Sequence, residues 1–178
     1  MKIGTPVLLG TLAALAAAAA IAADTPGAAC ALLTQGDLDA ATGSKSGAPN
    51  PMDQDVPTAP GQHVTMYACL WPVSGVQGQF AVSMGPVPPG QSAQSLGKNN
   101  VGMDALRAQH YTEETKDFGN STCSTMTPPA SVKGGVGMAA CTAVAQGKIV
   151  SVTFMSPTKK LSIEQTKVLL DKAIARLH

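Results

Sequence analysis

Residues 138–177 read MAACTAVAQGKIVSVTFMSPTKKLSIEQTKVLLDKAIARL and carry the clearest structural signal in the chain. Two apolar segments, 138–144 and 148–155, flank Ala-Gln-Gly, and the second is rich in β-branched residues. This pattern predicts a β-hairpin. Ser162 and Gln165 form a capping box, and apolar residues then recur at helical spacing up to Leu177. An amphipathic helix is therefore expected to follow the hairpin.

A second hairpin is expected upstream of this stretch. His63 to Trp71 alternates with a period of two, and residues 79–84 alternate again after a glycine-containing turn. Between the two predicted hairpins, residues 92–109 are compatible with one or two short helices, although Gly97 and Gly102 interrupt the pattern in the middle. Residues 111–116 are compatible with one more strand.

A short helix is expected near residue 34, where three residue types mark its ends. Thr34 is a favourable N-cap, Asp37 stands at N3, where its carboxylate favours the helix dipole, and Gly43 is a favourable stop. Antiparallel hairpins with a helix at each end predict an α+β fold. In it, the short N-terminal helix and the C-terminal amphipathic helix cover one face of an antiparallel sheet.

Two long segments, 44–62 and 120–137, are rich in Gly, Pro and small polar residues and show almost no periodicity. We interpret both as exposed loops. Prolines in the first segment fix φ and would lower the entropy lost when the loop docks on a partner. Because the two segments hold few groups able to do chemistry, we expect them to form a recognition surface.

The four cysteines are expected to form two structural disulfides. Cys30, Cys69, Cys123 and Cys141 allow three pairings, and no two of them have the C-x-x-C spacing of a redox or zinc site. We favour Cys30 with Cys69 and Cys123 with Cys141, because each pair links neighbouring segments. On the loop-entropy estimate each bond contributes about 3–4 kcal/mol.

The N-terminal residues have the organisation of a cleavable secretory signal peptide. Lys2 precedes an uncharged apolar run from Val7 to Ala23, and Ala20-Ile21-Ala22 offers an A-x-A cleavage pattern. We expect residues 1–23 to be removed and residues 24–178 to form one globular domain, periplasmic or secreted. The run is short for a membrane anchor, and the residues before Cys30 do not form a lipobox, so stable membrane insertion is not expected.

Composition bears on the class of partner. The chain has 12 Lys and Arg and 11 Asp and Glu, so removal of Lys2 leaves a formally neutral domain. Without a basic excess, nothing in the composition favours nucleic acid or anionic lipid as a partner. Only six aromatic residues are present, and they are too scattered to form a stacking platform for bases. We therefore expect the partner to be another extracytoplasmic protein.

Three short motifs resemble a family of small exported bacterial domains of unassigned function. They are Cys30-Ala31-Leu32-Leu33-Thr34, the strand motif Cys69-x-Trp71, and the C-terminal glycine-rich turn, hairpin and helix. Many members of this family are lipoproteins and are described as sensor-like or accessory. The resemblance implies no catalytic residues, so it supplies no active site to carry over.

Candidate chemistry in the remaining sequence is sparse. Ser95-x-x-Lys98 matches one motif of penicillin-recognising enzymes, but the companion motifs are absent. His63-x-x-Met66 places two soft ligands near the start of a predicted strand, which would suit copper in an oxidising compartment. The other strand methionines, such as Met84, are interpreted as fillers of an aromatic-poor core.

These observations favour a non-catalytic extracytoplasmic accessory or binding protein, of the kind that serves as a subunit of a larger envelope or secreted complex. No cofactor is expected. The alternative is a periplasmic copper carrier that uses His63 and Met66. A small secreted hydrolase is the third hypothesis.

Overall fold

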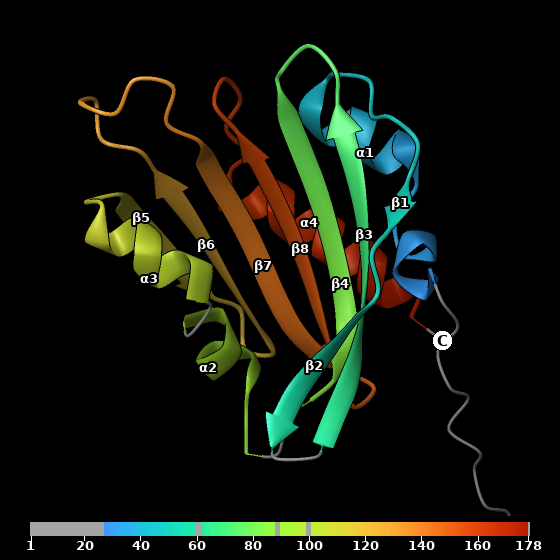
Figure 1. Ribbon diagram of the computed structural model, residues 1–178. Helices are drawn as coiled ribbons and strands as arrows, with labels where there is room; N and C mark the ends of the chain where they lie inside the picture. Colours follow the sequence, from blue (N-terminus) through green and yellow to red (C-terminus); the bar gives the residue numbers. More distant parts are fainter. Residues whose placement is uncertain (1–26, 60–61, 88–89, 99–100, 178) are drawn as a thin grey trace, which may run out of the picture.

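An 8-stranded antiparallel sheet dominates the computed structural model, which describes residues 27–59, 62–87, 90–98 and 101–177 (Figure 1). The predicted leader, residues 1–23, lies outside the described residues. In chain order the elements are η1 (Ala28–Ala31), α1 (Gln35–Thr42), β1 (Asn50–Pro51), β2 (Gln54–Ala59), β3 (Gln62–Val73), β4 (Gly78–Pro86), α2 (Ala93–Lys98), α3 (Val101–Ala108), β5 (Thr112–Asp117), β6 (Ser121–Thr127), β7 (Gly137–Ala145), β8 (Lys148–Ser156) and α4 (Ile163–Ala175). Within the described part of the chain, no helix is both long enough and apolar enough to cross a bilayer.

The strands follow the order β1-β3-β4-β8-β7-β6-β5, with β2 also paired to β3. Both predicted hairpins are confirmed: Val73 pairs with Gly78 at the turn between β3 and β4, and Ala145 pairs with Lys148 between β7 and β8. The two hairpins meet where β4 pairs with β8. The α+β class predicted from the sequence is also confirmed.

The sheet buries its large side chains on the face covered by η1, α1 and α4. Alternation along the strands places Trp71, Phe80 and Phe154 on this face, each at most 1% exposed. The rings of Phe80 and Phe154 contact each other with centroids 4.7 Å apart. Helix α4 packs five buried side chains against this layer, namely Ile163, Thr166, Leu169, Leu170 and Ala173.

Both predicted helix caps are present, and a buried carboxylate joins the two helices. Thr34 and Asp37 form the capping box of α1, and Ser162 and Gln165 form that of α4. The Asp37 carboxylate also accepts hydrogen bonds from Lys172 Nζ at 2.8 Å and from a guanidinium nitrogen of Arg176 at 2.6 Å. Asp37 therefore caps one helix and fixes the position of the other.

Both disulfides have the favoured pairing. Cys30 in η1 is bonded to Cys69 in β3, and Cys123 in β6 is bonded to its register partner Cys141 in β7. Because Cys69, Cys123 and Cys141 are completely buried, both bonds belong to the core. Free cysteines are absent from the described residues.

The interpretation of 44–62 and 120–137 as loops was wrong in part. The first segment contains β1 and β2, which pair with β3, and the second contains the interior strand β6. Strand β6 reads Ser-Thr-Cys-Ser-Thr-Met-Thr, so the predominance of hydroxyl side chains hides it from a search for apolar alternation. Its threonines are nevertheless β-branched, and the sheet buries most of the strand. The two short helices expected within residues 92–109 are present as α2 and α3, although Gly97 and Gly102 lie near the end of the first and the start of the second and not between them.

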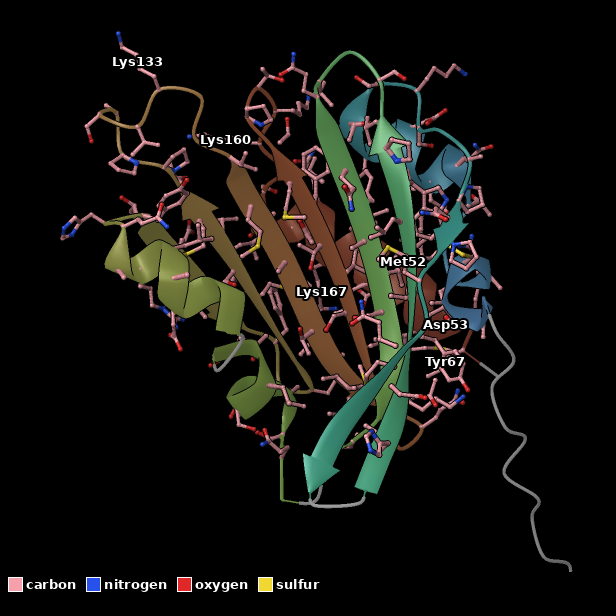
Figure 2. The ribbon with its side chains drawn as sticks, viewed as in Figure 1. Met52, Asp53, Tyr67, Lys133, Lys160 and Lys167 are labelled. Atoms are coloured by element: carbon pink, nitrogen blue, oxygen red, sulfur yellow. A yellow bond between two sulfur atoms is a disulfide. The ribbon has the colours of Figure 1, made fainter. Side chains whose placement is uncertain are left out.

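The opposite face of the sheet is largely uncovered. Helices α2 and α3 lie over its β5–β6 side, and Figures 1 and 2 look onto the remaining open face, with α4 behind the sheet. Most side chains on the open face are small and half-buried, for example Ala68, Ala81, Ser83, Ala140, Ser151 and Thr153. Of the methionines interpreted as core fillers, Met84 is in the core, whereas Met66, Met138 and Met155 are half-exposed on this second face.

Candidate functional site

The structure separates the two residues of the candidate copper site. His63 and Met66 are three positions apart on β3, so their side chains leave the strand on opposite faces. His63 is exposed, whereas Met66 lies over Gly85. Among the residues that the structure describes, no group of three or more His, Cys, Asp or Glu side chains could hold a metal ion. The structure therefore does not bring His63 and Met66 together as copper ligands.

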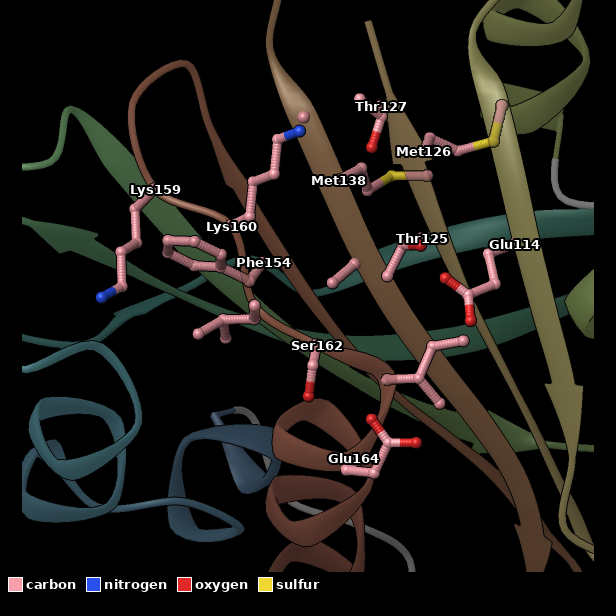
Figure 3. A pocket seen from close by; sticks show the side chains of 14 residues that line it. Glu114, Thr125, Met126, Thr127, Met138, Phe154, Lys159, Lys160, Ser162 and Glu164 are labelled. Atoms are coloured by element: carbon pink, nitrogen blue, oxygen red, sulfur yellow. The ribbon is translucent and has the colours of Figure 1, made fainter.

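A groove of about 220 Å³ opens beside the first turn of α4, on the covered side of the sheet (Figure 3). It lies where the ends of β6 and β8 and the start of β7 extend beyond the helix. The apolar part of its lining on this side includes Ala139, Phe154, Leu161 and Ile163. Met126 and Met138 also border it, but the alternation of β6 and β7 directs their side chains to the open face. The polar part includes Glu114, Thr125, Thr127, Lys159, Lys160, Ser162 and Glu164.

One wall of the groove is held in place by Ser156 at the end of β8. Its hydroxyl donates to the carbonyl oxygen of Val76 and accepts from the backbone N–H groups of Thr158 and Lys159. These bonds turn the chain after β8 back toward α4, where the Ser162 cap starts the helix. The segment between β8 and α4, which forms this wall, is therefore fixed at one end by the Ser156 hydrogen bonds and at the other by the Ser162 cap.

The rim of the groove carries opposite charges on its two sides. Figure 3 shows Glu114 and Glu164 on one side and Lys159 and Lys160 on the other. Glu164 also forms an ion pair with Lys116, with 3.1 Å between the nitrogen and oxygen atoms. A hydrogen bond from its own backbone N–H, followed by that ion pair, holds the pKa of Glu164 below its ordinary value. Glu164 is therefore fully ionised at neutral pH.

The lining offers recognition groups rather than a nucleophile with a base beside it. No histidine or cysteine is among the residues that line the groove. The Ser162 hydroxyl accepts from the Gln165 N–H as the helix cap. The S-x-x-K motif lies elsewhere, on α2, where the Ser95 hydroxyl donates to the carbonyl oxygen of Ser92. An apolar floor between two charged rims suits a side chain or a small amphipathic group.

A second hollow, of about 260 Å³, lies on the open face under β2. Its lining is mostly apolar and consists of Met52, Gln54, Met66, Ala68, Leu70 and Ser83. Met52 is 40% exposed, and Figure 2 shows it where the chain crosses β3. This hollow has no charged side chain among its lining residues, so it differs in chemistry from the groove beside α4.

The two segments predicted to form a recognition surface line different hollows. Residues from 120–137 supply Thr125, Thr127 and Gly137 to the groove, and residues from 44–62 supply Met52 and Gln54 to the hollow on the open face. The sequence did not predict that the remaining polar groups of the groove belong to one site. Glu114 and Glu164 are far apart in the chain, and nothing in the sequence shows that the sheet brings them together.

Comparison with known proteins supports the fold alone. No family model matches the chain, and no curated protein matches it. Among solved structures, the extracellular domain of PknH from Mycobacterium tuberculosis is similar, with a TM-score of 0.52 at 12% sequence identity. The match covers 86% of this chain and 98% of that one. At so low an identity, the likeness concerns the arrangement of the strands and helices.

Proposed function

We propose that this protein is a non-catalytic extracytoplasmic binding protein that recognises a partner protein through the groove beside α4. The observation that carries the proposal is the composition of that groove, an apolar floor between a carboxylate rim and a lysine rim. Such a site can bury one apolar anchor while its charged edges select and orient the segment that carries it.

The size of the groove favours a side chain of a partner over a larger ligand. Pockets for drug-sized molecules have volumes of about 300–1,000 Å³, whereas a cavity of about 150 Å³ holds one benzene ring. At about 220 Å³, the groove has room for a single large side chain. Buried anchors of this kind supply much of the binding energy at protein interfaces.

The extracytoplasmic location is supported by the two disulfides, which persist in oxidising compartments and are rare in the cytosol. The signal-peptide pattern of residues 1–23 and the resemblance to exported bacterial domains favour the same location. The structural neighbour is itself an extracellular domain. Whether the protein is periplasmic or secreted is a finer point, and the proposal holds for either.

The experiment fills the groove and measures capture of a partner. Thr127→Trp places an indole in the groove, and Thr153→Trp places the same ring on the open face as a matched control. A photo-crosslinking residue at Thr127 should capture one extracytoplasmic protein from the native host, and affinity for that protein should then be measured with purified components.

The Thr127→Trp variant should lose affinity at least tenfold, while Thr153→Trp should bind as the wild type does. Equal affinity of both variants for the captured protein would overturn the groove as the recognition site. Turnover of a substrate by the purified protein, abolished by Thr127→Trp, would instead favour an enzyme.

A further inference from the structure

The lysines are distributed unevenly over the molecule. Four loops lie at the end of the sheet where β3, β6 and β8 finish, and we call them together the lysine end: residues 44–49, 74–77, 128–136 and 157–161. Hydrogen bonds connect three of them, since the Ser74 N–H donates to the Lys45 carbonyl and the Thr158 hydroxyl donates to the Val76 carbonyl. The four loops contain Lys45, Lys133, Lys159 and Lys160 and no aspartate or glutamate.

These cations are available to an external partner. Lys133 and Lys160 are exposed, and Figure 2 shows both at this end of the molecule. Lys133, Lys159 and Lys160 form no ion pair with any described residue. The Lys45 side chain is 91% exposed, and its contact with Asp39 at 3.7 Å is of the exposed kind that contributes little.

Exposed apolar side chains accompany the lysines. Val132 and Val136, which flank Lys133 in the 128–136 loop, are 38% and 43% exposed. Their loop contains Gly134, whose φ of 71° is readily adopted only by glycine and shapes the turn between the two valines. Lysine next to exposed aliphatic residues is the pattern of surfaces that enter the headgroup region of a bilayer.

The chemistry of the lysine end fits a diffuse anionic surface better than a discrete polyanion site. Its loops contain no arginine, which would bind a phosphate through two nitrogens, and no aromatic residue on which a base or sugar could stack. The loops that carry its lysines lie along one end of the sheet, from the α1 side to the β6 side (Figure 1). Point charges spread along one edge match a flat surface of many headgroups.

We infer that the lysine end adsorbs reversibly to anionic phospholipid membranes, with Val132 and Val136 entering the headgroup layer. The formal neutrality of the mature domain does not favour an anionic lipid partner. Net composition, however, does not report where the charges lie on the folded molecule. Folding collects lysines in loops that hold no carboxylate. Adsorption of this kind needs no membrane-spanning segment, although it shares Lys159 and Lys160 with the rim of the groove beside α4.

The test is sedimentation of the mature protein with vesicles of phosphatidylglycerol and phosphatidylcholine in equal parts, compared with vesicles of phosphatidylcholine alone. Binding should require phosphatidylglycerol and should weaken as salt is raised. A variant that combines Lys133→Gln, Lys159→Gln and Lys160→Gln should partition to the vesicles much more weakly. Each lysine near an anionic surface raises the partition coefficient about fivefold. The combined control Lys116→Gln, Lys148→Gln and Lys167→Gln makes the same change in net charge elsewhere.

The control variant should keep most of the partitioning, and Val132→Ser with Val136→Ser should reduce it without altering its salt dependence. Equal losses in the two lysine variants would show that net charge alone is responsible and would overturn the inference. So would the absence of sedimentation with phosphatidylglycerol at low salt. Lysine-dependent binding to soluble dextran sulfate without binding to vesicles would assign the lysine end to acidic polysaccharide instead.

Discussion

The two faces of the sheet are made by the same strands, yet they differ in almost every physical property. On the covered face, Trp71, Phe80 and Phe154 are buried under η1, α1 and α4, and both disulfides lie there. On the open face, Ala81 and Ser83 alternate with these core residues and are half-buried. The contrast indicates that one face supplies most of the folding free energy, while residues on the other can change at lower cost.

The largest expected effect comes from comparing two adjacent residues on β3. Trp71→Ala should cost about 3–5 kcal/mol, because the side chain is 1% exposed and leaves a cavity in the core. Leu70→Ala, on the open face, should cost less than half as much, since Leu70 is only half-buried. Urea unfolding of the two variants measures the difference. Equal losses would show that the open face is covered in solution.

The next largest effect concerns the disulfides of the covered face. The bond between Cys30 and Cys69 spans 39 positions, and that between Cys123 and Cys141 spans 18. The loop-entropy estimate gives about 4 kcal/mol for the first and about 3 kcal/mol for the second. Replacing each pair by alanine should therefore destabilise the protein in that order in urea unfolding. The reverse order would show that core packing around Cys123, and not loop closure, dominates.

The comparison of faces also explains which elements could be predicted from sequence. Hairpins β3–β4 and β7–β8 were found because period-two alternation follows directly from one buried face, and the helices at 35–42 and 163–175 were found because capping boxes are local. Strand β6 was missed because both of its faces are buried while its residues are mostly Ser and Thr. Burial there is imposed by α4 on one face and by α2 on the other, elements that a local pattern does not reveal (Figure 1).

The groove and the lysine end could not be predicted, for a different physical reason. Glu114 and Glu164 come from β5 and α4, and Lys133 and Lys160 from two separate loops. Their proximity depends on the strand order β8-β7-β6-β5 and on the packing of α4 across these strands. Local patterns do not specify that order, so sequence reasoning identified the segments but not the surfaces they form together.

The ion pairs between Asp37 of α1 and the C-terminal end of α4 should make the stability of the protein depend on pH. Burial raises the pKa of Asp37, but hydrogen bonds from Arg176 and Lys172 outweigh it and hold the pKa well below its ordinary value. Because the pKa of Asp37 is lower in the folded state, ionisation of its carboxyl group stabilises the fold. This stabilisation is complete at pH values above the ordinary pKa of 3.8, and it is lost as the pH falls from there toward the folded-state pKa.

Asp37→Asn should therefore destabilise the protein at neutral pH by about 1.5–3 kcal/mol, the range for hydrogen bonds to charged groups. The variant should also lose part of the acid sensitivity of the wild type between about pH 4 and pH 2. Asp171→Asn is the control, because Asp171 pairs with Lys167 on the same helix but is 57% exposed. A similar loss in both variants would show that the contact between α1 and α4 has no special role.

The smallest expected effect lies on the open face, where hydroxyl groups take the place of apolar packing. The Thr142 and Ser151 hydroxyls are 2.8 Å apart across β7 and β8, and Thr142 is 8% exposed. Ser151→Ala leaves the Thr142 hydroxyl without this partner and should cost about 0.5–1.5 kcal/mol. Ser83→Ala changes the neighbouring position on β4, paired with Ser151 in register, and should fall within about 0.5 kcal/mol of the wild type. Urea unfolding measures the free-energy losses of Ser151→Ala and Ser83→Ala, with Trp71→Ala as the reference for a large loss. A Ser151→Ala loss near that of Trp71→Ala would mean that the open face is as constrained by folding as the covered one, and the contrast between the faces would fail.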